Sequence, residues 1–247
     1  MTITSSSDLA GMQRVGHLVA RTIAHMRSAV APGITTAQLD EMGERFARAE
    51  GARSAPQLTY DFPGFNCISV NEEIVHGIPG PRTLAPGDVV KLDVTLELDG
   101  LMADSAVTVL VPPSTHEARL LQRAARIALN QGLAAARAGR RLSEVGGVVE
   151  AAARREGATV LRDLCGHGIG RRLHEEPSVP NWADPRARTV LREGLVIALE
   201  PMLASAPARV VTESDGWTLR THSRVLAVHQ EHTIVIRRGA PLVLTAA

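Results

Sequence analysis

The chain has 247 residues, of which 45% are hydrophobic and 21% charged, and its formal net charge is +1. This length can bury the core of one large domain or of two closely packed halves, and the composition is ordinary for a globular enzyme. The small net charge argues against a dedicated nucleic-acid-binding protein, which normally has a strong basic excess.

Targeting signals and disulfides are not predicted. The first residues, MTITSSSDLAG, contain neither a basic region nor an apolar stretch of signal-peptide length. No segment approaches the roughly 20 apolar residues of a membrane span. Two cysteines, Cys67 and Cys165, make no disulfide framework. We therefore expect a cytoplasmic protein with no membrane association, folded as a single domain over residues 1–247 with a flexible start over residues 1–8.

Two helices are predicted at the start of the chain. Residues 8–30 carry apolar side chains along one helical stripe, and Pro32-Gly33 follows as a stop signal. Thr35 with Gln38 three residues later predicts a capping box that opens a second helix, and Gly51 ends it.

Two more helices are predicted in the middle of the chain. Ser114 and Glu117 form another capping-box pattern, which opens an Ala/Leu/Arg-rich helix that ends near Gly139. A fourth helix is predicted over 144–156.

The remaining segments are typical of strands and loops. Short strands are predicted through 66–78, and a second Asp-Gly hairpin signal lies at Asp215-Gly216. The order is therefore two helices plus strands, twice over, with further strands at the end. This order predicts the α+β class in one compact unit.

The segment KLDVTLELDGLMADSAVTV (91–109) predicts a β-hairpin with two unexpected aspartates. Asp99-Gly100 suits a two-residue type I′ turn, since both central positions of that turn need positive φ. In that register Asp93 faces Ala106 and Thr95 faces Asp104, so the two aspartates are diagonal neighbours on one face. A solvent-exposed face of the sheet explains the two aspartates equally well at this point, because antiparallel sheets often have one face in water.

Other ionisable groups stand in equally apolar surroundings. Glu200 ends the stretch LVIALE, Glu231 is predicted to lie inside a strand in VLAVHQEHTIVIR, and His167 sits in the glycine-rich LCGHGIG, which predicts a turn. Buried carboxylates are costly unless paired, and the chain has a single lysine. Four carboxylates and one imidazole suit a pair of divalent metal ions, because carboxylates can bridge two metals.

Two short motifs do not match the patterns that they resemble. The segment GHGIG superficially matches a dinucleotide fingerprint, but no helical pattern opens there. Neither HEEP nor HQEH is the H-E-x-x-H of helical zinc proteases.

The order of five motifs is far more specific than any one of them. NEEIVHGIP (71–79), LDVTLELDGLMADSAVTV, GHGIGRRLHEEP (166–177), LEPM (199–202) and EHT (231–233) closely resemble the bacterial type I methionine aminopeptidases. The resemblance runs from about residue 8 to 240. It implies the α+β pita-bread fold, in which two pseudo-symmetric halves hold a central antiparallel sheet covered by helices.

The resemblance also implies an activity and a set of metal ligands. Such enzymes remove the initiator methionine from nascent proteins when the second residue is small, by peptide hydrolysis assisted by two divalent metal ions. Mn, Fe and Co suit the oxygen-rich site, and Zn is an alternative. The ligands implied by the resemblance are Asp93, Asp104, His167, Glu200 and Glu231.

The resemblance implies roles for further residues. Glu200 would also shuttle the proton, His174 would stabilise the oxyanion at the scissile carbonyl, and His76 would contact the scissile nitrogen. The substrate-binding residues it implies are Tyr60, Phe62, Cys67, His76, Leu173, His174 and Trp217.

Some of these positions keep a second interpretation. Cys67 could equally be plain core, and Trp217 could be a packing residue after a hairpin turn. Leu173 stands where many relatives carry an aromatic residue, and Gly64-Phe65-Asn66 replaces a common Lys-Ser pattern, so the pocket and its rim differ from the family pattern.

Two rival functions remain at this point. A Pro-specific aminopeptidase or dipeptidase would share all five ligands but usually carries a large amino-terminal domain, and a catalytically inactive relative serving as a binding module usually loses ligands. The expected partners are the amino termini of nascent polypeptides, met near the ribosome, with no direct binding of nucleic acid. We expect a monomer, as relatives suggest.

Overall fold

A computed structural model describes residues 1–246 of the chain. Four long helices lie where the sequence predicts them, within a few residues, and a short fifth one joins them. The helices are α1 (Ser6–Ser28), α2 (Thr36–Ala49), α3 (Ala55–Tyr60), α4 (His116–Ala135) and α5 (Leu142–Arg155).

The strands form four small sheets. One sheet has the order β1-β4-β2 with β5 also paired to β4, and its strands are β1 (Arg53–Ser54), β2 (Cys67–Val70), β4 (Val89–Leu98) and β5 (Leu101–Leu110). The largest has the order β15-β14-β9-β7-β8, with β7 (Cys165–Gly168), β8 (Glu175–Pro180), β9 (Val196–Leu199), β14 (His232–Val235) and β15 (Leu242–Val243). A third sheet has the order β13-β10-β6, and its strands are β6 (Thr159–Val160), β10 (Met202–Ala204) and β13 (Ala227–His229). The fourth has the order β11-β12-β3, and its strands are β3 (Glu73–Val75), β11 (Val210–Thr212) and β12 (Leu219–Thr221).

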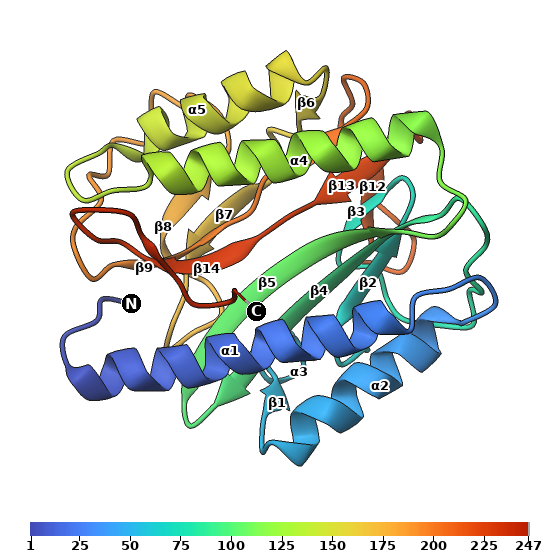
Figure 1. Cartoon of the computed structure of the whole chain (residues 1–247), viewed down its shortest axis with the longest axis horizontal. Coiled ribbons are helices and arrows are strands. Elements are labelled where there is room, and N and C mark those ends of the chain that lie inside the picture. The colour runs from blue at the N-terminus through green and yellow to red at the C-terminus, as the bar shows by residue number, and fades with distance from the viewer. Residues whose placement is uncertain (247) are drawn as a thin grey trace.

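The helices cover the sheets from two sides. Figure 1 shows α1 and α2 together on one side of the molecule and α4 and α5 together on the other, with the strands between them. One apolar core lies between α1, α2 and the β4–β5 hairpin, and two smaller cores lie beneath α4 and α5. The arrangement of two helices against strands, twice over, is the one predicted from the chain order.

The helix starts test the predicted caps. Thr35 caps α2 through the predicted capping box, with its hydroxyl accepting from the Gln38 amide and the Gln38 side chain accepting from the Thr35 amide. The prediction for α4 is wrong by one residue, because Thr115 rather than Ser114 is the N-cap, and its hydroxyl accepts from the Ala118 amide. The sequence offers two adjacent hydroxyl residues there, and either one can accept from an amide three residues later.

The short helix α3 was not predicted. Ser54 caps it by accepting from the Gln57 amide, and Pro56 lies in its first turn. A Ser followed closely by a Pro is a helix-start signal, but the helix has only six residues, too few for an apolar period to show. This helix matters because it ends at Tyr60, one of the predicted substrate-binding residues.

The predicted hairpin is confirmed in turn and register. Asp99 and Gly100 have φ values of 54° and 80°, as the type I′ turn requires. The pairs Asp93–Ala106 and Thr95–Asp104 face each other across β4 and β5. Asp93 and Asp104 are therefore diagonal neighbours.

The amino-terminal residues contact the rest of the domain. Thr2 forms a bridge with Leu195, and the Ile3 amide donates to the Gly194 carbonyl at 2.8 Å. Helix α1 begins at Ser6, two residues before the predicted start, while the flexibility of the first residues stays a prediction. Across residues 1–246, no helix combines the length and the apolar character needed to cross a bilayer.

Candidate metal centre and substrate cavity

Five predicted ligand side chains come from five separate segments. Asp93 lies in β4, Asp104 in β5, and Glu200 directly follows β9. Two expectations are wrong in detail: His167 lies in strand β7 rather than in a turn, and Glu231 lies in the junction between β13 and β14 rather than inside a strand. Asp104, His167, Glu200 and Glu231 are all at least nine-tenths buried.

The structure brings four of these side chains together, those of Asp104, His167, Glu200 and Glu231, and Asp93 lines the adjoining cavity beside Asp104. The His167 Nε2 atom lies 3.5 Å from Glu200 Oε1 and 3.9 Å from Asp104 Oδ2. Asp104, His167 and Glu231 each offer a ligand atom within 4.8 Å of the others. Ligand atoms that share one ion lie at such separations, because each is about 2.0–2.2 Å from the metal.

Glycines on both sides of His167 let its strand approach two neighbours closely. A Cβ on Gly166 would lie 2.4 Å from the Ala198 carbonyl oxygen, and one on Gly168 would lie 2.3 Å from that of Glu176. The His167 Nδ1–H donates to the Gly168 carbonyl at 2.9 Å. That bond leaves Nε2 with a free lone pair, which is the tautomer a metal ligand needs.

The electrostatics of the cluster favour a bound cation. Burial, and then the negative charges of the neighbouring carboxylates, raise the pKa values of Glu200 and Glu231 well above the ordinary range. Burial raises the pKa of Asp104 to about 6. Buried oxygens on Asp104 (Oδ1) and Glu231 (Oε1) have no hydrogen-bond partner within residues 1–246. These unpartnered carboxyl oxygens fit a divalent metal site, because a bound cation would favour their ionised form.

A hydrogen-bond ladder joins the segments that carry the cluster. The Asp104 amide donates to Thr233 Oγ1 at 2.9 Å, and the same hydroxyl donates to the Asp104 carbonyl at 2.8 Å. The Glu231 amide donates to the Ala106 carbonyl at 2.9 Å, and Ser105 Oγ donates to the Glu231 carbonyl at 2.7 Å. Strand β5 is thus fixed against the segment that contains Glu231.

A small cavity of about 70 Å³ opens beside the carboxylates. The Phe62 and Trp217 rings meet edge to face at 5.3 Å in its wall. Asp93 and Asp104 also line it, so the cavity is continuous with the candidate metal centre. The predicted substrate-binding residues lining it are Tyr60, Phe62, Cys67, His76, Leu173, His174 and Trp217.

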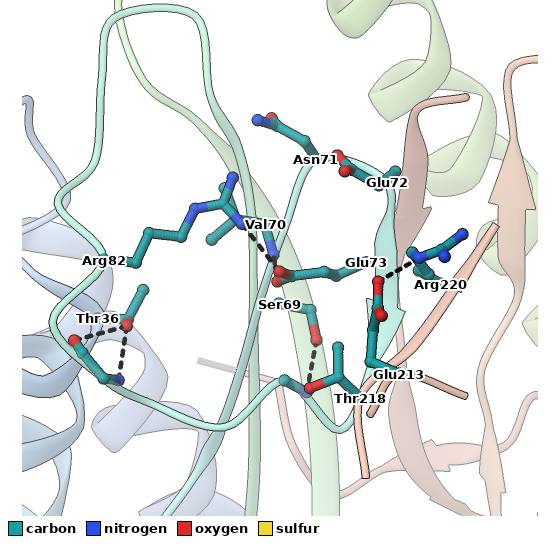
Figure 2. Close-up of polar contacts among 12 residues, drawn as sticks. Thr36, Ser69, Val70, Asn71, Glu72, Glu73, Arg82, Glu213, Thr218 and Arg220 are labelled. Atoms are coloured by element: carbon teal, nitrogen blue, oxygen red, sulfur yellow. Dashed lines mark hydrogen bonds and ion pairs between the residues drawn. The ribbon is translucent and has the colours of Figure 1, made fainter. Parts of the chain in front are cut away.

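His76 lies at the start of a loop, residues 76–82, that hydrogen bonds anchor to neighbouring segments. Its φ of 57° is left-handed, and a Cβ on the next residue, Gly77, would lie only 2.4 Å from the Ile68 carbonyl oxygen. Figure 2 shows the polar contacts of this loop. Arg82 Nη1 donates to Glu73 Oε1 at 2.8 Å, and Thr36 Oγ1 accepts from the Gly80 amide at 2.9 Å.

The two predicted catalytic histidines are held neutral. Burial, and then the proximity of His174, lower the pKa of His76 to about 4. Burial also lowers the pKa of His174. A neutral imidazole can donate one hydrogen bond to a substrate atom without carrying a charge of its own.

Tyr60 contacts His174 as well as lining the cavity. Its hydroxyl lies 2.5 Å from His174 Nδ1. A phenol donates readily to an imine nitrogen, and this assignment leaves the His174 Nε2–H as the ring's remaining donor. The His174 ring also packs edge to face on His167, with 4.2 Å between the ring centroids.

One buried residue of the cluster was missed from the sequence. His229 ends β13, and its Nε2 lies 3.5 Å from Glu200 Oε2 and 3.7 Å from Glu231 Oε2. The one signal for it was its position two residues before Glu231, in an otherwise apolar strand. Residues two apart in extended chain share a face, so an imidazole there points the same way as Glu231.

Comparison with known proteins shows the family to which this chain belongs. Residues 10–238 match the model of metallopeptidase family M24. The chain belongs to that family. It is 38% identical over 247 residues to a protein called methionine aminopeptidase 2 from Bacillus subtilis, with 99% of each chain covered. It is also 36% identical to methionine aminopeptidase 1 of the same organism, over 96% of each chain.

Solved structures extend the comparison to the fold. The methionine aminopeptidase of Thermotoga maritima superposes with a TM-score of 0.96 and 33% identity, covering 100% of both chains. A prolidase from Pyrococcus furiosus superposes with a TM-score of 0.81 and 18% identity, and only 66% of that chain is covered. This M24 chain therefore has the expected α+β pita-bread fold, which it shares with both groups.

Proposed function

We propose that this M24 metallopeptidase is a type I methionine aminopeptidase that removes the initiator methionine from nascent proteins whose second residue is small. The observation that carries the proposal is the continuity between the buried carboxylate–histidine cluster and the cavity whose wall includes Phe62 and Trp217. A cavity with a largely apolar wall next to a hydrolytic centre suits the side chain of a first residue such as methionine. The full-length relatives with that name support the same substrate.

The proposal assigns the metal ligands as Asp93, Asp104, His167, Glu200 and Glu231. Two divalent ions bound there would supply Lewis acidity and an acidic water at neutral pH. Mn, Fe and Co suit the four carboxylates, and Zn is the alternative.

The remaining residues bind the substrate and move protons. Glu200 accepts the proton released by the attacking water and passes it on toward the leaving amine. His174 donates from Nε2 to the scissile carbonyl oxygen as charge develops on it, and His76 contacts the scissile nitrogen. The first side chain enters the cavity lined by Tyr60, Phe62, Cys67, Leu173 and Trp217, with Leu173 leaving more room than an aromatic would.

The proposal also covers how the chain works in the cell. The whole chain acts as one catalytic domain, as a monomer in the cytoplasm. It meets its substrates, the amino termini of nascent polypeptides, near the ribosome. Neither nucleic acid nor membrane takes part.

One assay separates this function from its rivals. The metal-loaded protein is incubated with Met-Ala-Ser and with Ala-Pro-Ala, and free amino acids are measured by mass spectrometry. Release of Met is the expected result, whereas cleavage of Ala-Pro-Ala alone indicates a Pro-specific peptidase and no cleavage indicates an inactive binding module. Asp104→Asn, purified in parallel, controls for host aminopeptidases, because it should release nothing.

A second pair of peptides tests the preference for a small second residue. The peptides MTITSS and MLITSS differ only in that residue, and the first copies the start of this chain. Faster release of Met from MTITSS is expected, since a long branched side chain would be pressed against the mouth of the cavity. Equal rates would argue for a broader aminopeptidase.

A further inference from the structure

His229 is a buried imidazole without a hydrogen-bond partner. It is 1% exposed, and neither Nδ1 nor Nε2 has a partner within residues 1–246. Leaving a buried polar group unpaired is unfavourable, and most such groups in native proteins have a partner. A buried histidine whose two ring nitrogens both lack a partner therefore indicates that a group from outside the polypeptide binds to the ring.

The neighbours of the ring indicate what that group is. Nε2 lies 3.5 Å from Glu200 Oε2 and 3.7 Å from Glu231 Oε2, which is too long for a good hydrogen bond. Two ligand atoms on one ion, each about 2.1 Å from it at an angle of 110–120°, are roughly 3.4–3.6 Å apart. Glu200, His229 and Glu231 each offer one such atom within 4.8 Å of the other two.

The backbone keeps the ring where it is. The His229 amide donates to Thr108 Oγ1 at 3.0 Å, and that hydroxyl donates to the His229 carbonyl at 2.8 Å. On the other side, His229 faces Met202 in the pairing of β13 with β10. The imidazole is thus presented from a fixed strand end, as a metal ligand requires.

The Glu200 carboxyl group lies between the imidazoles of His229 and His167. Its Oε1 atom faces His167 Nε2 and its Oε2 atom faces His229 Nε2, each at 3.5 Å. A carboxylate that bridges two ions places one oxygen on each. One imidazole therefore lies beside each oxygen of Glu200, where it would hold an ion together with that oxygen.

We propose that His229 is a sixth ligand of the metal centre, which supplies a second imidazole through Nε2 beside Glu200 and Glu231. The inference rests on the metal-dependent function proposed above and adds to its ligand set. Imidazole suits Zn and Fe better than Mn, whereas carboxylate and water suit Mn. A centre with two imidazoles should therefore favour Zn or Fe over Mn more strongly than a centre with one.

The decisive test counts metal-bound imidazoles directly. The full chain is labelled with ¹⁵N-histidine, and its long-range ¹H–¹⁵N spectra are recorded as Zn²⁺ is added to the metal-free protein. Two rings should show a metal-bound nitrogen at saturation in the unmodified chain, and one in His229→Gln. His167→Gln should also leave one ring, which is then His229.

A matched variant and a binding measurement control for a general effect of losing a histidine. His222→Gln makes the same change at an exposed histidine and should still show two metal-bound rings. The weaker-bound Zn²⁺ should lose about tenfold or more in affinity in His229→Gln, measured by competition with a chromophoric chelator, and should be unchanged in His222→Gln.

A single metal-bound ring in the unmodified chain overturns the inference, and so does a count of two that is unchanged in His229→Gln. The count in the unmodified chain decides the matter even if His229→Gln fails to fold. The count does not depend on turnover, so release of Met from Met-Ala-Ser by the same sample tests the proposed function separately.

Discussion

Lys91, the single lysine of the chain, is fully buried in β4, and its replacement should stabilise the protein. Its ammonium donates to the Asn71 carbonyl at 2.8 Å and to the Val89 carbonyl at 3.3 Å. Both carbonyls also accept from backbone amides, Asn71 from Ala227 and Val89 from Asn71. Lys91→Met therefore removes a buried charge and leaves each carbonyl with a partner.

The magnitude follows from proton linkage. Burial lowers the pKa of Lys91 from 10.5 to about 7. Between those values the unfolded chain binds more protons than the folded one, so the free energy of unfolding rises with pH through this window. For this one group the rise from pH 6 to pH 8.5 is about 2 kcal/mol, and below pH 7 the buried charge costs about 5 kcal/mol in all.

The assay is urea denaturation of both proteins at pH 6 and pH 8.5, with the same saturating metal. Because the other groups titrate alike in both proteins, the difference between their free energies of unfolding reports the effect of Lys91 alone. We expect Lys91→Met to be several kcal/mol more stable than the unmodified chain at pH 6, and its advantage to shrink by about 2 kcal/mol at pH 8.5. An advantage that is absent, or that does not change with pH, would refute the reasoning.

Three further predictions concern the site. Asp104→Ala should abolish turnover and lower the bound metal measured by elemental analysis after dialysis, and full occupancy would remove Asp104 from the ligand set. His174→Ala should keep its metal but lose about 2.7–4 kcal/mol of transition-state stabilisation, and near-normal kcat/KM would rule out the oxyanion role. Tyr60→Phe should lower kcat about fivefold, for one hydrogen bond of about 1 kcal/mol, with KM unchanged. The same change in a His174→Ala background should have no effect, and an equal loss there would show that Tyr60 does not act through His174.

Local patterns in the sequence were enough to predict the hairpin and most helices. Asp99-Gly100 determined both the turn and the register of β4 and β5, because a type I′ turn leaves little freedom to the pairs beside it. The second Asp-Gly signal also lies in a connection between paired strands, β11 and β12. Helix α3 was missed because six residues carry no period.

The site was harder to predict because its parts come from distant segments. The chain order of the motifs, matched to a known family, allowed five ligands to be named, whereas His229 fitted no motif and was passed over. Its importance depends on the pairing of β13 with β10 and on the approach of Glu200, neither of which local patterns reveal. Likewise, the contact between Tyr60 and His174 spans 114 positions and arises only from the fold.

Hydrogen bonds join β5 to the segment 229–233, and we call this contact the seam. The seam stabilises the fold and also holds together residues that could bind one ion. The short stretch of β5 that carries Asp104 forms hydrogen bonds with Glu231 and Thr233. An opening of the seam would separate ligands of one ion, so bound metal makes that opening less frequent. At an ion concentration of 100 Kd the added free energy is about 2.7 kcal/mol, which slows amide hydrogen exchange at Asp104 and Glu231 about a hundredfold if these amides exchange through that opening.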